Sequence, residues 1–434
     1  MACQSRLLPL QDTFSRHPAL GRSCNRPVLL AHPAVPNRFH FRRLWYEFVK
    51  KSRSSTVTHI DRKFLRLRRT PAPPAHFTLV ATAKNEGPYL LEWVAYHRSI
   101  GFNDIIIFQN DSEDYTGKIL ACLDEIGAVR YRYNQAKRGG HQIAAYNRSV
   151  RHSEYQSADW AMALDLDEFL VIKTGDGTLP ALLSAAPKFH RMLINWKLFG
   201  SSGVETIQSG LVTDRYSLAE KDSFISKFVQ PYKTLFKREA FLRPGVHKPS
   251  KFLLDEEMIT VNGSGLSDKA FEIRNFQSTD PGLRCLAQVN HYIVKDPQSF
   301  VLKSAKGSAH QANRDIGETY WEKRNKNHEP DHSIRANRPR LIREMKRLNN
   351  LSGGRLRALT DQAVAYHREK FDAMRNDPDL AKLYDFCATR SGVTPPEPRR
   401  ISNFPIKGVR LTTGVKKTDY GGFRILDINR SRAS

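Results

Sequence analysis

Cysteines are few in this sequence, and none of them forms a pattern typical of a metal or disulfide site. Five are scattered over 434 residues without a CxxC pair or a Cys/His cluster: Cys3, Cys24, Cys122, Cys285 and Cys387. An odd number of dispersed cysteines argues against a zinc module and against a disulfide framework. A reducing compartment is the simplest fit to this usage.

Long hydrophobic runs are absent as well. No apolar run reaches the roughly 20 residues that a bilayer-spanning helix needs. The first residues lack the apolar core of a signal peptide. We therefore expect a soluble, cytoplasmic protein, and its charge is compatible with peripheral contact at the inner face of a membrane.

Positive charge is abundant but unevenly distributed. The net charge is +25, and residues 1–75 hold 15 Lys and Arg against 3 Asp and Glu, while residues 388–434 hold 10 against 3. The N-terminal stretch is also rich in Pro and His and shows no periodicity, which predicts a poorly ordered arm. Within it, FRRLWYEFVKK (41–51) could form a short amphipathic basic helix at an anionic surface.

Strand and helix patterns alternate in the middle of the chain, with short connections. Apolar and β-branched runs predict four strands, at 77–83, 104–110, 128–134 and 160–172. Apolar residues at helical spacing predict three helices, at 87–101, 116–127 and 139–155. These strands are too apolar for a sheet with one solvated face. The pattern predicts an α/β fold in which helices cover both faces of a mostly parallel sheet.

Changes in pattern divide the chain into four regions. Looser strand patterns continue to about residue 305, and a charged helical pattern follows them. The predicted regions are a basic arm (1–75), an α/β domain (76–305), a helical region (306–390) and a basic tail (391–434).

Polar residues follow three of the predicted strands. They lie in ATAKNE (81–86), FQNDSED (108–114) and LDLDEF (164–169). Ligands of open parallel sheets bind beyond the carboxyl ends of the strands, so we expect these loops to meet at one crevice. Asp165 and Asp167 would project to the same side of an extended chain. Their mutual repulsion costs stability unless a cation or a proton neutralises them, and Mg²⁺ and Mn²⁺ prefer such oxygen ligands.

Taken together, these motifs resemble glycosyltransferase family 2 and its relative family 92. The resemblance covers about residues 77–305 and is carried by KNE (84–86), EW…YH (92–97), DSED (111–114), the helix with Gln142 and Asn147, and DLDEF (165–169). It implies a GT-A fold, in which an α/β sandwich binds a nucleotide-diphospho-sugar. It also implies metal-dependent transfer of the sugar to an acceptor hydroxyl, with inversion.

The resemblance further implies roles for individual residues. Asp165 and Asp167 would hold Mn²⁺ or Mg²⁺ together with His291, for which His247 is a rival. Residues expected at the nucleotide and its phosphates are Thr82, Lys84, Glu86, Asn110, Asp111, Ser112, Arg138, Gln142, Asp165 and Lys303. The implied partners are a UDP- or GDP-sugar donor and a glycan, lipid-linked or protein acceptor, and no nucleic acid is implied.

The general base is harder to identify. Inverting transfer needs a group that deprotonates the acceptor hydroxyl, and the usual family 2 Glu-Asp pair has no clear counterpart here. Glu205 is the nearest candidate, because Gly200 and Gly203 around it suggest close approach of a substrate. Asp214 and Glu220 remain rivals.

Other classes of function are open on the sequence alone. The main alternative is a non-catalytic protein whose basic ends bind nucleic acid or an anionic membrane, although no aromatic-basic recognition module is visible. A GT-A domain that only binds carbohydrate is a second alternative. A nucleotidyltransferase usually carries a Gly-rich loop with a basic residue after its first strand, and ATAKNEGP does not match that pattern.

Overall fold

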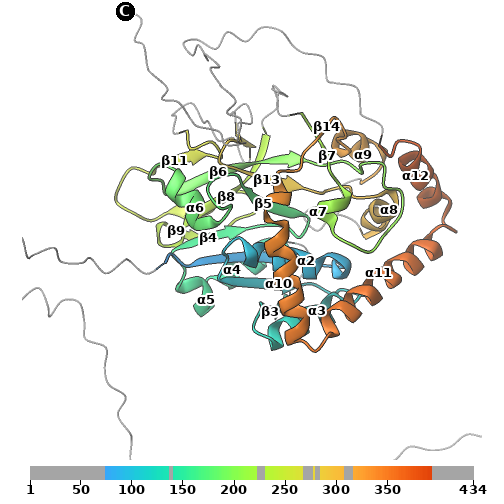
Figure 1. Cartoon of the computed structure of the whole chain (residues 1–434), viewed down its shortest axis with the longest axis horizontal. Coiled ribbons are helices and arrows are strands. Elements are labelled where there is room, and N and C mark those ends of the chain that lie inside the picture. Colours follow the sequence, from blue (N-terminus) through green and yellow to red (C-terminus); the bar gives the residue numbers. More distant parts are fainter. Residues whose placement is uncertain are drawn as a thin grey trace, which may run out of the picture. The chain divides into compact units, whose positions relative to one another are not determined.

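A mixed sheet forms the centre of the protein, in a computed structural model that describes residues 74–135, 140–221, 230–266, 277–278, 284–306 and 316–392. Its strand order is β3-β2-β1-β4-β8-β6-β13-β5, with β11 beside β6 and β12 beside β8 (Figure 1). The strands are β1 (Phe77–Ala83), β2 (Asp104–Gln109), β3 (Arg130–Tyr133), β4 (Trp160–Ala163), β5 (Glu168–Ile172), β6 (Arg191–Leu198), β8 (Gln230–Lys237), β11 (Thr260–Asn262), β12 (Gln277–Ser278) and β13 (Ala287–His291). The predicted arm up to residue 73, Arg138 and the predicted tail beyond residue 392 lie outside the described residues.

The first four strands of the sheet run parallel, and its other half is mixed. β1 pairs in parallel with β2 and β4, and β2 pairs in parallel with β3. β8 then runs antiparallel to both β4 and β6, and β5 runs antiparallel to β13. Parallel neighbours need crossover connections, which the helices between these strands provide. The predicted α/β class is confirmed, with its parallel part in the first half of the sheet.

Helices cover both faces of the parallel strands. They are α2 (Gly87–Ser99) and α3 (Thr116–Glu125) on one face, and α4 (His141–Ser149) and α5 (Ser153–Gln156) on the other. Leu79 and Ile107 belong to the hydrophobic core that includes α2 and α3. Val80 and Ile106, one residue away in each strand, belong to the core that includes α4 and α5. β1 and β2 are largely apolar because alternate side chains enter two different cores.

The run from residue 160 to residue 172 forms two strands, and the predicted single strand is wrong. β4 pairs with β1 and β8, whereas β5 lies at the far end of the sheet beside β13. A turn at residues 164–167 separates them. Both strands are buried, so the apolar pattern continues across the turn and hides it.

Helices from the C-terminal part of the chain complete the core of the sheet. α10 (Arg338–Leu351) and α11 (Arg355–Met374) pack against α2 (Figure 1). Leu341, Leu348, Leu356 and Ala363 belong to the same core as α2. The domain boundaries drawn from the sequence remain predictions. The other elements are α6 (Leu179–Ala185), α7 (Val212–Arg215), β7 (Leu218–Ala219), η1 (Arg238–Ala240), β9 (Phe241–Arg243), β10 (Ser250–Phe252), α8 (Pro297–Lys306), α9 (Glu318–Arg324), β14 (Glu329–Pro330), η2 (Ser333–Asn337) and α12 (Pro378–Ala388).

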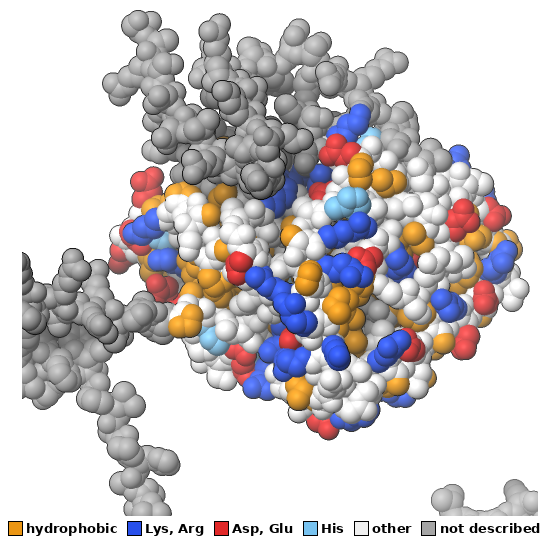
Figure 2. All heavy atoms as spheres, in the orientation of Figure 1, with side chains coloured by type: hydrophobic (Ala, Val, Ile, Leu, Met, Phe, Trp, Pro, Cys, Tyr) orange, Lys and Arg blue, Asp and Glu red, His pale blue; other side chains and the backbone are white. Residues whose placement is uncertain are grey.

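Lys and Arg side chains gather on the face that α10 crosses (Figures 1 and 2). Several have acidic partners: Arg338 lies 2.9 Å from a carboxylate oxygen of Asp214, and Arg340 lies 3.1 Å from one of Asp176. These pairs join α10 to α7 and to the segment between β5 and α6, so part of this charge has a local structural role. No helix in the described part of the chain is both long and apolar enough to cross a bilayer.

His97, on α2, is expected to make the fold sensitive to acid. Its side chain is fully buried; Nδ1 donates to the carbonyl of Trp93 (2.9 Å), and Nε2 faces the amide of Leu170 (3.4 Å). Burial lowers its pKa from 6.5 to about 3. The neutral ring is therefore the form that favours the folded state. Its contribution to the free energy of unfolding is complete above pH 6.5 and falls by about 1.4 kcal/mol for each pH unit below that value.

We expect the free energy of unfolding to drop by about 2 kcal/mol from this group between pH 6.5 and pH 5. Urea denaturation at both pH values measures it. His97→Gln should be less stable at pH 7 but should lose less on acidification than the wild type. His332→Gln, at an exposed position, is the matched control and should follow the wild type. Equal acid losses in all three proteins would contradict the prediction.

Candidate active site

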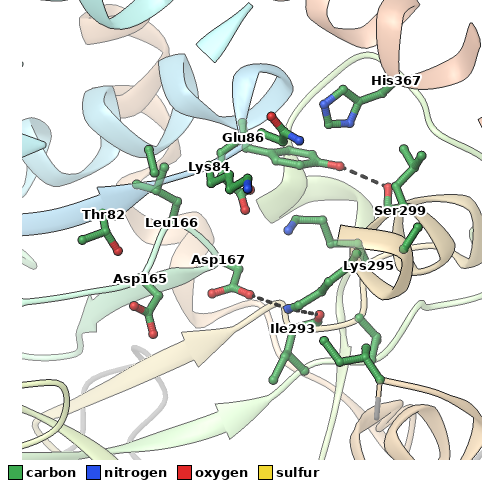
Figure 3. Close-up of a pocket in the computed structure, with 18 of the residues that line it drawn as sticks. Thr82, Lys84, Glu86, Asp165, Leu166, Asp167, Ile293, Lys295, Ser299 and His367 are labelled. Carbon is green, nitrogen blue, oxygen red and sulfur yellow. Dashed lines mark hydrogen bonds and ion pairs between the residues drawn. The ribbon is translucent and has the colours of Figure 1, made fainter. Parts of the chain in front are cut away.

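A cavity of about 470 Å³ lies at the carboxyl ends of β1, β2 and β4, as the parallel strands predict. Side chains from α8 and α11 also line it, and Figure 3 shows its interior. His247, the rival histidine, is among the lining residues. So are most of the predicted site residues: Thr82, Lys84, Glu86, Asn110, Gln142, Asp165, Asp167, His291 and Lys303.

Hydrogen bonds hold the loop after β1 against the loop after β2. The amide of Asn85 donates to Ser112 Oγ (3.0 Å), and the amide of Gly87 donates to Asp114 Oδ2 (3.0 Å). The same oxygen of Asp114 lies 2.8 Å from Nε2 of His367 on α11. The two strand ends and a C-terminal helix are thereby fixed together at one wall of the cavity.

Asp111 and Ser112, predicted at the nucleotide, are not among the residues that line the cavity. Asp111 has a left-handed backbone (φ +32°) and accepts a hydrogen bond from the hydroxyl of Tyr133. Ser112 accepts the amide of Asn85 described above. Both residues therefore shape the loop after β2, while Asn110 beside them reaches the cavity.

Asp165 and Asp167 lie on the turn between β4 and β5, not on an extended strand. Within this turn the amide of Glu168 donates to the carbonyl of Asp165 (3.0 Å), and the amide of Asp165 donates to Glu168 Oε2 (2.8 Å). Both aspartates line the cavity (Figure 3). The turn brings them to the same site that the sequence pattern predicted, by a different backbone geometry.

Both carboxylate oxygens of Asp165 have protein partners. Gln142 Nε2 donates to Oδ1 (2.7 Å), and Lys233 Nζ donates to Oδ2 (3.0 Å). Lys233 is fully buried on β8 and also lies 3.1 Å from Glu168, which is fully buried too. Burial raises the pKa of Glu168 well above its usual range, while Asp165 and Glu168 outweigh burial and raise the pKa of Lys233. The lysine therefore stays charged and holds the base of the turn.

Asp167 faces a lysine and a histidine. Its Oδ2 lies 3.1 Å from Lys303 Nζ, and its Oδ1 lies 3.5 Å from His291 Nε2. Burial acts to raise the pKa of Asp167, but Lys303 and His291 outweigh it and hold that pKa well below its usual range. Burial lowers the pKa of His291, so its ring is neutral at neutral pH, the form that binds metals.

Asp167 and His291 fit a divalent cation better than Asp165 does. Their nearest polar atoms are 3.5 Å apart in the cavity, whereas both oxygens of Asp165 are occupied by Gln142 and Lys233. No group of three His, Cys, Asp or Glu side chains suited to a metal occurs within the described ranges. Mg²⁺ and similar ions often take only one or two protein ligands and complete their shell with water and phosphates. The pair fits such an ion.

The structure does not bring the candidate bases to the cavity. Glu205 is exposed and is not among the lining residues, Asp214 is bound to Arg338, and Glu220 is buried against Arg284. Nor does Gly200 indicate a substrate, because a Cβ there would meet the side chain of Asn327 at 2.2 Å. Close packing of the protein itself explains that glycine.

Several residues of the site were missed from the sequence. Lys233 supports the turn from within the apolar strand β8, where a lysine in YKTLF was the available signal. Lys295 lines the cavity four residues after His291. The lining residues from α11 had no local signal, because only tertiary packing brings that helix to the cavity: Tyr366, His367, Lys370 and Met374.

Comparison with known proteins extends this description. Residues 83–269 match the model of glycosyltransferase family 92. A family 92 protein of Ricinus communis is 24% identical over 174 residues, which cover 37% of this chain and 31% of the relative. One of Oryza sativa subsp. japonica is 30% identical over 149 residues, which cover 33% and 25%. The chain therefore spans a third or less of the curated relatives that it matches.

Solved structures show weaker likeness. Staphylococcus aureus TarS (residues 1–349, in complex with UDP) is 14% identical, with a TM-score of 0.26 over 38% of this chain and 47% of that one. Glucosyl-3-phosphoglycerate synthase from Mycobacterium tuberculosis, in complex with Mn²⁺, UDP and glucosyl-3-phosphoglycerate, is 12% identical, with a TM-score of 0.23 over 40% and 62%. The segment from residue 83 to residue 269, which carries the Asp-Leu-Asp turn, is thus similar to glycosyltransferase family 92.

Proposed function

We propose that this protein is a glycosyltransferase that moves a sugar from a nucleotide-diphospho-sugar to an acceptor hydroxyl. The observation that carries the proposal is the convergence of Asp167, His291 and Lys303 in one cavity beyond the parallel strands. A carboxylate and a neutral imidazole suit a divalent cation, and a nearby ammonium suits phosphate oxygens. The similarity to family 92 supports the same reaction class.

We propose one orientation of the donor in the cavity. Thr82, Glu86 and Asn110 lie at the ends of β1 and β2, where they would contact the base and ribose. Asp165, whose carboxylate is held in place by Gln142 and Lys233, would face the ribose as well. The diphosphate would then lie near Asp167 and Lys303, with the sugar beyond it.

A divalent cation, Mn²⁺ or Mg²⁺, would be held by Asp167 and His291. When bound, it would neutralise charge that develops on the diphosphate as the sugar leaves. Lys303 now contacts Asp167 and the carbonyl of Ile293 (2.8 Å), and its side chain is 31% exposed. It can therefore turn from the carboxylate to a phosphate oxygen without losing every partner.

We propose inverting transfer, in keeping with the sequence pattern, and this mechanism needs a base beside the acceptor. Glu205 is exposed and outside the cavity lining, so it is not part of the proposed machinery. The acceptor would be a glycan, a lipid-linked sugar or a protein hydroxyl. Peripheral attachment to a membrane through the basic arm remains compatible with this proposal.

Calorimetric titration with UDP and GDP, each with and without Mn²⁺, tests the proposed function. We expect one of the two nucleotides to bind, and Mn²⁺ to strengthen its binding. The same titration at higher salt separates this reaction class from charge-driven binding to polyanions, which falls steeply with salt. Absence of binding by both nucleotides under all conditions would contradict the proposal.

A further inference from the structure

Lys295 has an unusual combination of backbone and environment. It lies between β13 and α8, and its backbone is left-handed (φ +56°), a conformation that costs energy for a residue other than glycine. Its side chain is only 7% exposed and lines the cavity. A strained backbone at a residue that lines a cavity commonly reflects function, because the surrounding structure must maintain the strain.

The ammonium of Lys295 lies over an aromatic ring and has no acidic contact. Its Nζ is 4.3 Å from the centre of the Tyr89 ring. Within the described residues it forms no ion pair and no hydrogen bond. The adjacent carboxylate of Asp296 is bound instead by the hydroxyls of Tyr216 (2.8 Å) and Ser299 (2.7 Å). A ring face offsets only part of the cost of burying a charge, and Asp167, whose pKa Lys295 helps to lower, is already paired with Lys303 at 3.1 Å.

Three other lysines in or near the cavity differ from Lys295, because each contacts an acidic side chain. Lys303 contacts Asp167, Lys370 contacts Glu113, and Lys233 contacts two carboxylates. Figure 3 shows the Lys295 side chain reaching from the α8 side into the cavity, toward the end of β1 that carries Lys84. Lys295 is therefore placed to receive a negatively charged group that enters the cavity.

We propose that Lys295 binds a phosphate group of a substrate. The proposal rests on the proposed function, because the diphosphate of the donor is the first source of such a group. A phosphate on the acceptor is the second source, and both present the same oxygens to the ammonium. The ring of Tyr89 keeps the ammonium directed into the cavity, and the left-handed backbone places it there before the ligand arrives.

Titration of UDP and uridine into the wild type and Lys295→Asn tests this role. Asparagine tolerates the left-handed backbone, so the variant removes the charge without adding strain. We expect UDP to bind about 10- to 100-fold more weakly to the variant, and uridine equally to both proteins. Lys295→Arg keeps the charge and should retain most of the UDP affinity. Thermal denaturation checks that all variants are folded.

Lys251 provides a matched control. It also has a left-handed backbone (φ +35°), but it is exposed and does not line the cavity. Lys251→Asn removes the same charge from the same backbone conformation, and it should leave UDP binding unchanged. Equal weakening by both substitutions would assign the effect to overall charge and overturn the proposal.

The two sources of phosphate give different results. If UDP affinity is unchanged in Lys295→Asn but pyrophosphate binding to the UDP-saturated protein is lost, the phosphate belongs to the acceptor. If no nucleotide binds to the wild type, the proposed function fails, and pyrophosphate alone then tests Lys295. Pyrophosphate binding that depends on Lys295 would support the residue's role even then. The proposed role of Lys295 is overturned if UDP and pyrophosphate each bind equally well to the wild type and to Lys295→Asn. It is also overturned if neither of them binds to the wild type.

Discussion

Replacing Lys233 with methionine is expected to lower the free energy of unfolding by about 3–5 kcal/mol. Lys233 is fully buried on β8, and its Nζ lies 3.0 Å from a carboxyl oxygen of Asp165 and 3.1 Å from one of Glu168. Methionine fills a similar volume but leaves these acids without their cation. Asp165 then keeps its negative charge without a cation, and the fully buried carboxyl group of Glu168 loses its donor. Urea or guanidinium denaturation at pH 7 measures the loss.

A control on the same strand separates this charge effect from general disturbance of β8. Lys237 is only partly buried at the end of that strand, and Lys237→Met should change the free energy of unfolding by less than about 1 kcal/mol. Adding Asp165→Asn to Lys233→Met should restore part of the stability, because the carboxylate that lost its cation is then a neutral amide. Equal losses in the two single variants, with no recovery in the double variant, would refute the assigned role.

Asp167→Asn is expected to reduce Mn²⁺-dependent nucleotide binding by about 100-fold or more, and sugar transfer with it. The substitution keeps the size of the side chain but removes its negative charge. His291 and Lys303 then lose the carboxylate that they share, at 3.5 and 3.1 Å. Metal-free binding of the nucleotide should change much less, because the contacts at the ends of β1 and β2 remain.

Asp255→Asn is the matched control for this experiment, since Asp255 is exposed and does not line the cavity. It should bind the nucleotide and Mn²⁺ as the wild type does. Titration of Mn²⁺ at fixed nucleotide gives the comparison directly. An Asp167→Asn protein that is folded and stays within about threefold of the wild type would show that the metal proposal is wrong.

Local sequence pattern was enough to predict the parallel half of the sheet. β1, α2, β2 and α3 lie within two residues of their predicted bounds, because their apolar periodicity reflects burial against near neighbours in the chain. The strand ends then indicated one crevice, since the carboxyl ends of parallel strands must lie at the same edge. Thr82, Asn110 and Asp167 were found in this way.

The break between β4 and β5 shows where such patterns fail. Both strands are buried, so apolar residues continue on either side of the turn, and no glycine or proline marks it. β4 pairs with β8, and β5 pairs with β13. Both of these partner strands lie more than 50 residues further along the chain. The assumption of one extended strand therefore failed, although both aspartates still reach the cavity.

Residue types and their spacing were sufficient for the α/β class, for the resemblance to family 92 and for the acidic residues at the crevice, because these patterns are carried by near neighbours in the sequence. Tertiary structure alone decided which charges are paired. Lys233 meets Asp165 across 68 residues, whereas Lys295 lies beside a carboxylate in the sequence and makes no ion pair with it. The energy of a charge depends on burial and on partners brought together by folding, and no local pattern specifies either.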